Sequence, residues 1–286
     1  MNYTYYPGCS LQGTAKDYGA SIQGICKELG MGLKEIPEWT CCGATSAHSI
    51  NHQASIALAA RTLNQAAEMH NARMLVPCPM CFNRLKTASY MLKSDECDRY
   101  SITLSDSVPE IWDLASLFAT TEILDSVVKM IKKPLEGLKV VCYYGCMASR
   151  PPEITGARDF EDPQSLDRIV SALGGTAIPW AYKTDCCGAS QLLSLEEVET
   201  RLVEKLFVMA KHAGAKGIVV SCQMCQANLD MFHDRLGCAP DQSPAMPVFY
   251  FTELIGLALK NKEIKKWLSG HLTDPFPLLR ELELIT

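Results

Sequence analysis

The sequence predicts an α/β protein of two pseudo-symmetric halves, each a small parallel sheet flanked by helices. Two observations indicate this fold. A pattern of five cysteines, in which a single cysteine precedes an adjacent pair and then a Cys-x-x-Cys, occurs once in each half of the 286 residues. Around these cysteines, short apolar runs alternate with segments of helical periodicity. Internal repetition of this kind decides the fold before any local propensity does.

The two cysteine sets nearly keep register along the chain. Cys41 and Cys186 are 145 positions apart, and Cys78 and Cys222 are 144 apart. Chance does not place ten of fourteen cysteines in this way. The chain therefore contains two copies of one thiolate-rich metal site: the first set is Cys9, Cys41, Cys42, Cys78 and Cys81, and the second set is Cys146, Cys186, Cys187, Cys222 and Cys225.

The residues beside the cysteines repeat as well. Tyr5-Tyr6-Pro-Gly-Cys9 matches Tyr143-Tyr144-Gly-Cys146, and Met74–Cys81 matches Ile218–Cys225. Cys142 aligns with Thr4 and is expected to be a strand residue, although it could substitute as a metal ligand. Met80 and Met224 occupy matching positions inside the two Cys-x-x-Cys motifs and could form walls of the metal sites.

One helix is expected near the start of the first half. Gly30 and Gly32 would end it, and its apolar face has the spacing i, i+4, i+7, i+11 at Tyr18, Ile22, Ile25 and Leu29. Residues 95–137 join the halves. They should contain a second helix with apolar positions at Ile111, Leu114, Leu117 and Phe118.

The second half contains two further helix signals. Asp162-Pro163 should begin a helix as N-cap and first-turn proline, with Gly174-Gly175 at its end and one apolar face of Leu166, Ile169, Val170 and Leu173. Ser194 and Glu197 have the spacing of a capping box ahead of another helix.

Buried strands are expected at 74–76, 139–141 and 218–220. Strands alternating with helices imply Rossmann-like units, in which the loops after the carboxyl ends of the strands meet at one edge. Every cysteine group follows a strand-like run, so both metal sites are expected at these edges, at the domain interface. We assign residues 1–135 to a first domain with the connecting helix and residues 136–286 to a second domain with a C-terminal extension. The apolar run 248–259 in that extension is expected to pack on the second domain, rather than to form a partner surface.

The composition excludes several classes of protein. Hydrophobic residues make up 48% and charged residues 21%, as in globular proteins, and a formal charge of −5 gives no sign of a nucleic-acid partner. The N-terminus lacks a secretory signal pattern, and no apolar run is long enough to span a bilayer. We therefore expect a soluble cytoplasmic protein, in which many cysteines indicate metal or redox chemistry rather than disulfides.

Five thiolates per site favour an iron–sulfur cluster. A structural zinc site takes four ligands, commonly as two Cys-x-x-Cys pairs, whereas each set here has one such pair, one adjacent pair and one distant cysteine. Adjacent cysteines rarely chelate one ion together, but they can reach different irons of a larger cluster. A zinc-stabilised scaffold remains the alternative.

The paired C…CCG…CxxC units resemble, over essentially the whole chain, the cysteine-rich CCG domains found in the B subunits of heterodisulfide reductases. The stretch CCGATSAHS after Thr40 resembles the bacterial-type branch of that family. The resemblance implies that each five-cysteine set holds one non-cubane [4Fe-4S] cluster, with one cysteine bridging two irons. It also implies two partners: one like the family's C subunits, with cubane [4Fe-4S] clusters, and one like its flavin-containing A subunits.

Two functions follow from this resemblance. In the first, two facing clusters reduce or form a disulfide, such as that of coenzyme M and coenzyme B, each cluster supplying one electron. In the second, the same clusters form an electron-transfer module of a quinone- or fumarate-linked oxidoreductase, without disulfide chemistry of its own.

Several other side chains are weaker candidates. His48 could donate a proton to a leaving thiolate, although His48 and His52 at i, i+4 are more typical of solvated or capping histidines. Lys183 could attract an anionic substrate, but a surface lysine is the simpler interpretation. The remaining thiols, Cys26, Cys97 and Cys238, are interpreted as spare.

Overall fold

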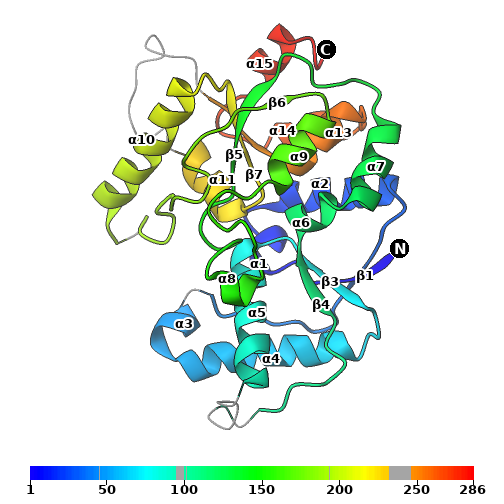
Figure 1. Cartoon of the computed structure of the whole chain (residues 1–286), viewed down its shortest axis with the longest axis vertical. Helices are drawn as coiled ribbons and strands as arrows, with labels where there is room; N and C mark the ends of the chain where they lie inside the picture. The colour runs from blue at the N-terminus through cyan, green and yellow to red at the C-terminus, as the bar shows by residue number, and fades with distance from the viewer. Residues whose placement is uncertain (45, 95–99, 101, 193, 232–245) are drawn as a thin grey trace.

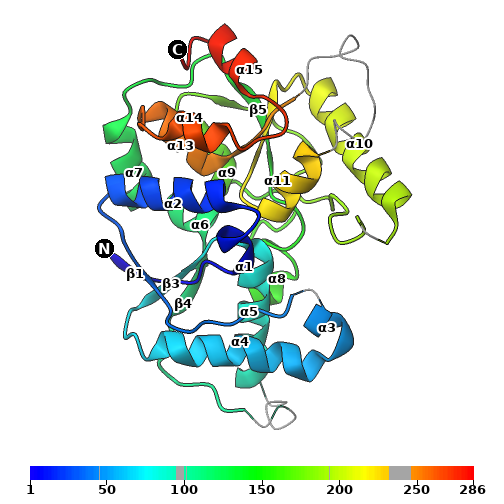
Figure 2. The same cartoon turned by 180° about the vertical axis from the view of Figure 1, so that it is seen from behind.

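Two four-stranded parallel sheets, each flanked by helices, form the protein in the computed structural model (Figures 1 and 2). The α/β prediction is thereby confirmed. The structure describes residues 1–44, 46–94, 100, 102–192, 194–231 and 246–286. Cys97 and Cys238 lie outside these described residues.

The first sheet has the strand order β2-β1-β3-β4, and all neighbouring strands are parallel. Its strands and the helices between and after them are β1 (Asn2–Tyr5), α1 (Cys9–Gln12), α2 (Lys16–Glu28), β2 (Gly32–Glu35), α3 (Ser46–Ile50), α4 (His52–Ala67), β3 (Arg73–Val76), α5 (Pro79–Lys93), β4 (Glu110–Asp113), α6 (Leu114–Phe118) and α7 (Thr121–Met130).

The second sheet repeats this topology with the order β6-β5-β7-β8, again all parallel. Its elements are β5 (Lys139–Tyr143), α8 (Pro152–Thr155), α9 (Ser165–Ala172), β6 (Thr176–Ala177), α10 (Glu196–His212), β7 (Gly217–Val220), α11 (Gln223–Asp230), β8 (Val248–Tyr250), α13 (Phe251–Ala258), α14 (Ile264–Leu268) and α15 (Phe276–Glu281).

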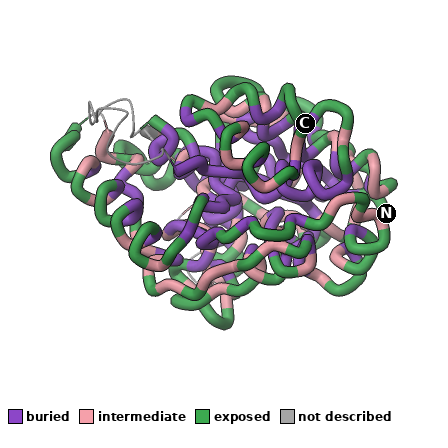
Figure 3. The backbone as a smooth tube through the Cα atoms, turned by 90° about the horizontal axis from the view of Figure 1, so that it is seen from above, coloured by how far each residue is buried: buried purple, intermediate pink, exposed green. Residues whose placement is uncertain are grey.

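The two faces of the first sheet contribute to different cores. Successive side chains of a strand point to opposite faces. Tyr3, Tyr5 and Leu75 accordingly join a core that also contains the strands of the second sheet. Met74 and Val76 join a separate core made only of first-repeat residues. In Figure 3 the buried backbone runs through the middle of the molecule, with exposed segments around it.

The repeats are joined through their helices. From the first repeat, α2 packs against α13 and α14, and α6 packs against α9 of the second repeat. Within this interface the Tyr18 hydroxyl donates to the Ser221 carbonyl at 2.9 Å, and the Tyr18 and Tyr250 rings stack with centroids 4.0 Å apart. Ser21 and Thr252 share a buried hydroxyl–hydroxyl hydrogen bond of 2.7 Å. The interface is therefore packed and hydrogen-bonded, and it holds the cysteine-bearing edges of both sheets close together.

The helix expected around Ile111 begins later than predicted. Ile111 lies in β4 and pairs with Met74 of β3, and α6 starts at Leu114, capped by the Asp113 carboxylate, which accepts from the Ser116 amide at 2.9 Å. The predicted helix is thus present as α6, but Ile111 is not part of it, because four apolar positions at mixed spacing fit a strand followed by a short helix equally well. The run 248–259 forms β8 and α13 and is buried throughout, which confirms packing over an exposed partner surface.

Both predicted caps of the second repeat were wrong. The Asp162 carboxylate pairs with Lys183 Nζ at 2.7 Å instead of capping a helix, and α9 begins at Ser165. Ser194 lies outside α10, which starts at Glu196, and its hydroxyl donates back to the Gln191 carbonyl at 3.4 Å. In each case a nearby side chain or turn offers a competing partner for the polar group.

Cys142 is a strand residue as predicted, but its counterpart is not Thr4. The β5–β7 register pairs Tyr143 with Val220, and the β1–β3 register pairs Tyr5 with Leu75, one residue before Val76. Tyr143 therefore matches Tyr6, and Cys142 matches Tyr5. The one-residue gap in the sequence match concealed this correspondence.

Lys183 is buried rather than on the surface, at 3% exposed. Besides Asp162, its ammonium contacts the Asp167 carboxylate at 3.0 Å and donates to the Pro163 carbonyl at 3.1 Å. Burial by itself lowers the pKa of Lys183, but hydrogen bonds to Asp162 and Asp167 outweigh it and raise the pKa above 10.5. The charged ammonium of Lys183 is thus already paired with carboxylates of the fold. The expectation that it attracts an anionic substrate is therefore dropped.

Replacing Lys183 with Met should lower the free energy of unfolding by about 3 kcal/mol, because the half-buried Asp167 keeps its charge without its partner. Since the folded-state pKa is raised, this contribution should be fully present below pH 10.5 and disappear as the pH rises further. Urea denaturation across this pH range measures both effects. The exposed pair of Lys205 with Asp185 provides the control, because Lys205→Met should change stability much less. Equal losses in the two variants would contradict the role of burial.

Candidate metal centre

All ten cysteines of the two sets lie where the sequence predicts, beyond the carboxyl ends of strands. Cys9 begins α1 after β1, and Cys78 caps α5 after β3. In the second repeat Cys146 follows β5, and Cys222 occupies the N-cap position of α11 after β7. The adjacent pairs follow β2 and β6. Since the sheets are parallel, each set of loops gathers at a single edge.

In the first set, three sulfurs form a buried group and two lie outside it. The sulfurs of Cys42 and Cys81 are 3.2 Å apart, and the Cys81 amide donates to the Cys78 sulfur at 3.4 Å. Cys42, Cys78 and Cys81 are buried, whereas Cys9 and Cys41 are exposed.

The second set repeats this arrangement. The sulfurs of Cys187 and Cys225 lie 3.6 Å apart, and the Gly188 amide donates to the Cys186 sulfur at 3.3 Å. In the first repeat the matching Gly43 amide donates to Cys41 at 3.5 Å. Backbone N–H groups thus point at sulfur in both repeats, as they do around anionic metal thiolates.

The crowding of sulfurs shifts their pKa values in opposite directions. In the first set, the hydrogen bond from the Cys81 thiol lowers the pKa of Cys42, and the contacts with Cys42 and Cys78 raise that of Cys81. In the second set, a hydrogen bond from Cys146 lowers the pKa of Cys186 to about 6, and the pKa of Cys146 rises. The sulfurs of one set therefore cannot all become thiolates unless positive charge is placed among them.

This arrangement fits a multi-metal cluster better than a single ion. The twelve described cysteines are free thiols. Among the described residues, no three histidine, cysteine or carboxylate side chains converge closely enough to hold one metal ion. Soft sulfur donors that gather in sets of five, without the arrangement of a single-ion site, suit an iron–sulfur cluster.

Glycine is required where each first cysteine approaches its set. Gly8 and Gly145 have φ of 72° and 67°, in the left-handed region. A Cβ on Gly8 would lie 3.1 Å from the Cys81 sulfur, and one on Gly145 would lie 3.0 Å from the Cys225 sulfur. Any side chain at either position would push into the space around the sulfurs.

Two tyrosines fix the adjacent cysteine pairs, and the sequence analysis did not identify them. The Tyr6 hydroxyl donates to the Thr40 carbonyl at 2.7 Å, and the Tyr143 hydroxyl donates to the Asp185 carbonyl at 2.6 Å. Each carbonyl belongs to the residue before a Cys-Cys pair. The signal was present in the repeated Tyr-Tyr motif, but the gap concealed which tyrosines correspond.

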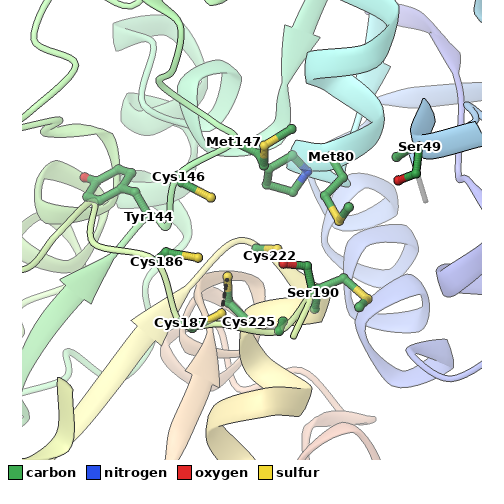
Figure 4. A pocket seen from close by; sticks show the side chains of 14 residues that line it. Ser49, Met80, Tyr144, Cys146, Met147, Cys186, Cys187, Ser190, Cys222 and Cys225 are labelled. Carbon is green, nitrogen blue, oxygen red and sulfur yellow. Dashed lines mark hydrogen bonds between the residues drawn. The ribbon is translucent and has the colours of Figure 1, made fainter. Parts of the chain in front are cut away.

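A cavity of about 530 Å³ lies at the boundary between the repeats (Figure 4). All five thiols of the second set line it, and no thiol of the first set does. The first repeat contributes Ala44, Ser49, Pro79 and Met80, and the remaining walls are Tyr144, Met147, Ala189, Ser190 and Met224. Met80 and Met224, which were expected to form walls of the metal sites, both line this cavity, and so does Met147. No charged side chain is among the lining residues that the structure describes.

The weaker candidates lie away from this cavity. His48 is exposed, and its ring lies 3.1 Å from the Arg84 guanidinium. Burial, together with the charge of Arg84, lowers the pKa of His48 below its ordinary 6.5. Its role as a proton donor stays a prediction. Cys26 and Cys142 are buried among apolar side chains, which raises the pKa of Cys26 to about 12 and that of Cys142 well above its ordinary value.

Comparison with known proteins adds a family to this geometry. The model of the CCG family, described as a cysteine-rich domain, matches the chain twice, over residues 3–86 and 140–230. A solved structure titled a hypothetical protein from Helicobacter pylori has the same fold, with a TM-score of 0.68 at 9% identity. The alignment covers 96% of this chain, which spans about half (52%) of that one.

Curated relatives match most of the chain. The 8-methylmenaquinol:fumarate reductase membrane anchor subunit of Wolinella succinogenes is 29% identical, with 90% of this chain and 92% of the relative covered. The B subunit of the ferredoxin:CoB-CoM heterodisulfide reductase of Methanosarcina mazei is 27% identical, with 79% and 78% covered. A protein of Archaeoglobus profundus, named as similar to the B subunit of heterodisulfide reductase, is 24% identical, with 91% of both covered. In the described part of this chain, no helix has the length and apolar character to cross a membrane.

In the metal-free chain, thiol alkylation should separate the cysteines by exposure. Exposed Cys9, Cys41 and Cys186 should react with iodoacetamide well before Cys26 and Cys142, because burial shields these two thiols and keeps them protonated. Peptide mass spectrometry after timed quenching at pH 7 measures the order. Labelling of Cys26 or Cys142 as fast as Cys9 would contradict the structure, and unfolding in urea should abolish the difference.

Proposed function

The chain belongs to the CCG family of cysteine-rich domain proteins, and from this premise we propose that it is the iron–sulfur subunit of a heterodisulfide reductase-like complex. In this proposal it reduces a disulfide, or forms one in the reverse direction. The observation that carries the proposal is the cavity at the repeat boundary, into which the second cysteine set opens completely. Relatives named for the B subunit of heterodisulfide reductase support the choice of reaction.

Each set of five thiols would hold one non-cubane [4Fe-4S] cluster, and residues 1–135 and 136–286 would be the two domains that carry them. The crowded sulfurs support this assignment, because a cluster supplies the positive charge that lets them ionise together. Ligands would be the same ten cysteines that the sequence singles out. Because Gly8 and Gly145 have no Cβ, the space beside the sulfurs stays open for a cluster.

Reduction of a disulfide to two thiols takes two electrons and two protons. Two clusters would together supply the electrons, one each, to the bond that breaks. The chain itself provides the enclosure: Met80, Met147 and Met224 line the cavity with polarizable thioethers, exclude water and pack against a sulfur-containing substrate. The second set lines the cavity, whereas the first set contributes only residues beside its cysteines, namely Ala44, Pro79 and Met80.

Partners would complete the electron path. A protein like the family's C subunits, with cubane [4Fe-4S] clusters, would deliver electrons, fed by a flavin-containing protein like its A subunits. The exposed Cys9 and Cys41 support entry of electrons at the first set, because no thiol of the first set lines the cavity whereas all five of the second set do. The complex would work in the cytoplasm, where thiols remain reduced.

A second candidate is an electron-transfer module of a quinone- or fumarate-linked oxidoreductase. The Wolinella succinogenes relative, which is named for an 8-methylmenaquinol:fumarate reductase, supports it. The uncharged lining of the cavity suits the apolar ring of a quinone no less than it suits a disulfide. In that case the substrate sulfur chemistry would be absent and only single electrons would pass.

Turnover with disulfides separates the two candidates. The protein, purified without oxygen together with its partner subunits, should reduce the mixed disulfide of coenzyme M and coenzyme B or a related disulfide, and its electron paramagnetic resonance spectrum should change on disulfide addition. Cys42→Ala and Cys187→Ala should each lower turnover at least about 100-fold, because each removes a metal ligand. Cys26→Ala, which changes a thiol outside both sets, is the control. If the protein turns over a menaquinone and reduces none of the disulfides, the result would instead support the second candidate.

Gly145→Ala should empty the second site. Its Cβ would lie 3.0 Å from the Cys225 sulfur, so we expect the iron content to fall from ~8 per chain by roughly half. Gly156→Ala is a matched control, since Gly156 also has a positive φ of 78° but has nothing within 4 Å of its added Cβ. Iron and sulfide analysis with thermal denaturation measures both variants. A similar loss of iron in the two would attribute the effect to backbone strain and contradict the steric explanation.

A further inference from the structure

Gln223 is a buried amide whose hydrogen-bonding groups are not used within the fold. It is the second residue of the Cys222–Cys225 motif and the first residue of α11, and it is 3% exposed. Neither its amide nitrogen nor its amide oxygen has a hydrogen-bond partner among the residues that the structure describes. Since buried polar groups are nearly always paired, such a side chain indicates a partner that the protein part alone does not supply.

The group that Gln223 approaches belongs to the other repeat. The two Cys-x-x-Cys motifs meet at the repeat boundary, because Pro79 and Met80 of the first and Cys222 and Met224 of the second line the same cavity. In agreement with this geometry, the pKa of Cys78 is lowered mainly by hydrogen bonding from Cys81 and, to a smaller extent, by the Gln223 side chain. A residue next to a second-set ligand therefore approaches a first-set ligand. Cys78 and Cys222 also both lie close enough to Tyr18 to raise the pKa of its phenol, after the larger effect of burial.

An amide next to sulfur has one favourable orientation. A thiolate only accepts hydrogen bonds, so the NH₂ group of Gln223 must face it. A neutral thiol is a weak acceptor, whereas a metal-bound thiolate carries negative charge and accepts strongly. The unpaired amide of the metal-free chain would therefore gain its partner when Cys78 binds iron.

This amide breaks the symmetry of the two sites. The repeats match at Cys78 and Cys222 and again at Met80 and Met224, but Pro79 occupies the position that corresponds to Gln223. Proline has no side-chain donor. Only the first set can receive such a hydrogen bond from the opposite Cys-x-x-Cys motif.

We propose that the Gln223 amide donates a hydrogen bond across the repeat boundary to the Cys78 sulfur and raises the reduction potential of the first set's cluster relative to the second. Gln223 is then a positioning residue rather than a catalytic one. This inference rests on one part of the proposed function, namely that each cysteine set holds an iron–sulfur cluster. Hydrogen bonds to cluster sulfurs stabilise the more negative reduced state, so they raise the potential.

Potentiometric titration of the oxygen-free holoprotein, followed by electron paramagnetic resonance, tests this role. Gln223→Met keeps the length and removes the donor, and Gln223→Glu keeps the shape and replaces the donor with oxygen. Both should shift the first set's reduction equilibrium toward the oxidised form by about tenfold, which is about 59 mV for one electron. The signals are assigned with Cys42→Ala and Cys187→Ala, each of which removes one cysteine from one set and should remove the signal of that set's cluster. Gln12→Met is the control, because Gln12 is an exposed amide near Cys9 that already donates to Glu35 at 3.1 Å.

The proposal stands if the midpoint of the first set's cluster falls in both variants while that of the second stays within a third of this shift. Unchanged midpoints, equal shifts of both clusters, or a shift of the second alone would overturn it. Loss of either cluster from both variants would make Gln223 an assembly residue and would also overturn it. If the unmodified chain itself takes up no iron and sulfide, the proposed function fails instead, so the two failures are distinguishable.

Discussion

Repulsion among crowded sulfurs is the constraint to which the rest of the structure is fitted. The sulfurs of Cys42 and Cys81 lie 3.2 Å apart, and those of Cys187 and Cys225 lie 3.6 Å apart, in buried surroundings. Neighbouring thiolates at such distances are unfavourable without positive charge between them. Backbone amides of Gly43 and Gly188 point at sulfur, and glycines at positive φ bring Cys9 and Cys146 in without a Cβ. The local backbone is therefore built around an anionic group of sulfurs.

The interface between the repeats converts two such groups into a single functional region. Helices α2 and α6 of the first repeat pack on α13 and α9 of the second, so the carboxyl edges of the two sheets face a common boundary. A cavity opens there, and its lining combines second-set cysteines with first-repeat Pro79 and Met80. Neither repeat could form this cavity alone. The shared core, in which Tyr3 and Tyr5 join residues of the second sheet, continues across this boundary.

The repeats have diverged at the positions that face this boundary. Pro7 of the first repeat corresponds to Tyr144 of the second, which lines the cavity and donates to the Asp167 carboxylate at 2.8 Å. That carboxylate also binds Lys183, so the wall on this side is held by a buried ion pair for which the described residues of the first repeat show no counterpart. Pro79 and Gln223 differ in the same way. Substitutions of this kind give the two matching sets of cysteines different access and different electrostatic surroundings.

The sequence by itself determined the duplicated parallel sheets, the edge at which the cysteines gather and the identity of the ten sulfurs. Spacing in the chain encodes these features directly, because a strand–loop–helix unit places whatever follows the strand at one edge. Only the tertiary structure decided that Lys183 is buried and ion-paired, that Tyr6 and Tyr143 hold the cysteine pairs, and that the second set alone lines the cavity. It also decided that the Gln223 amide is buried without a hydrogen-bond partner among the described residues. Each of these depends on which side chains two distant segments bring together at an interface. Local pattern carries no record of that, because periodicity describes a residue's own element and not the element packed against it.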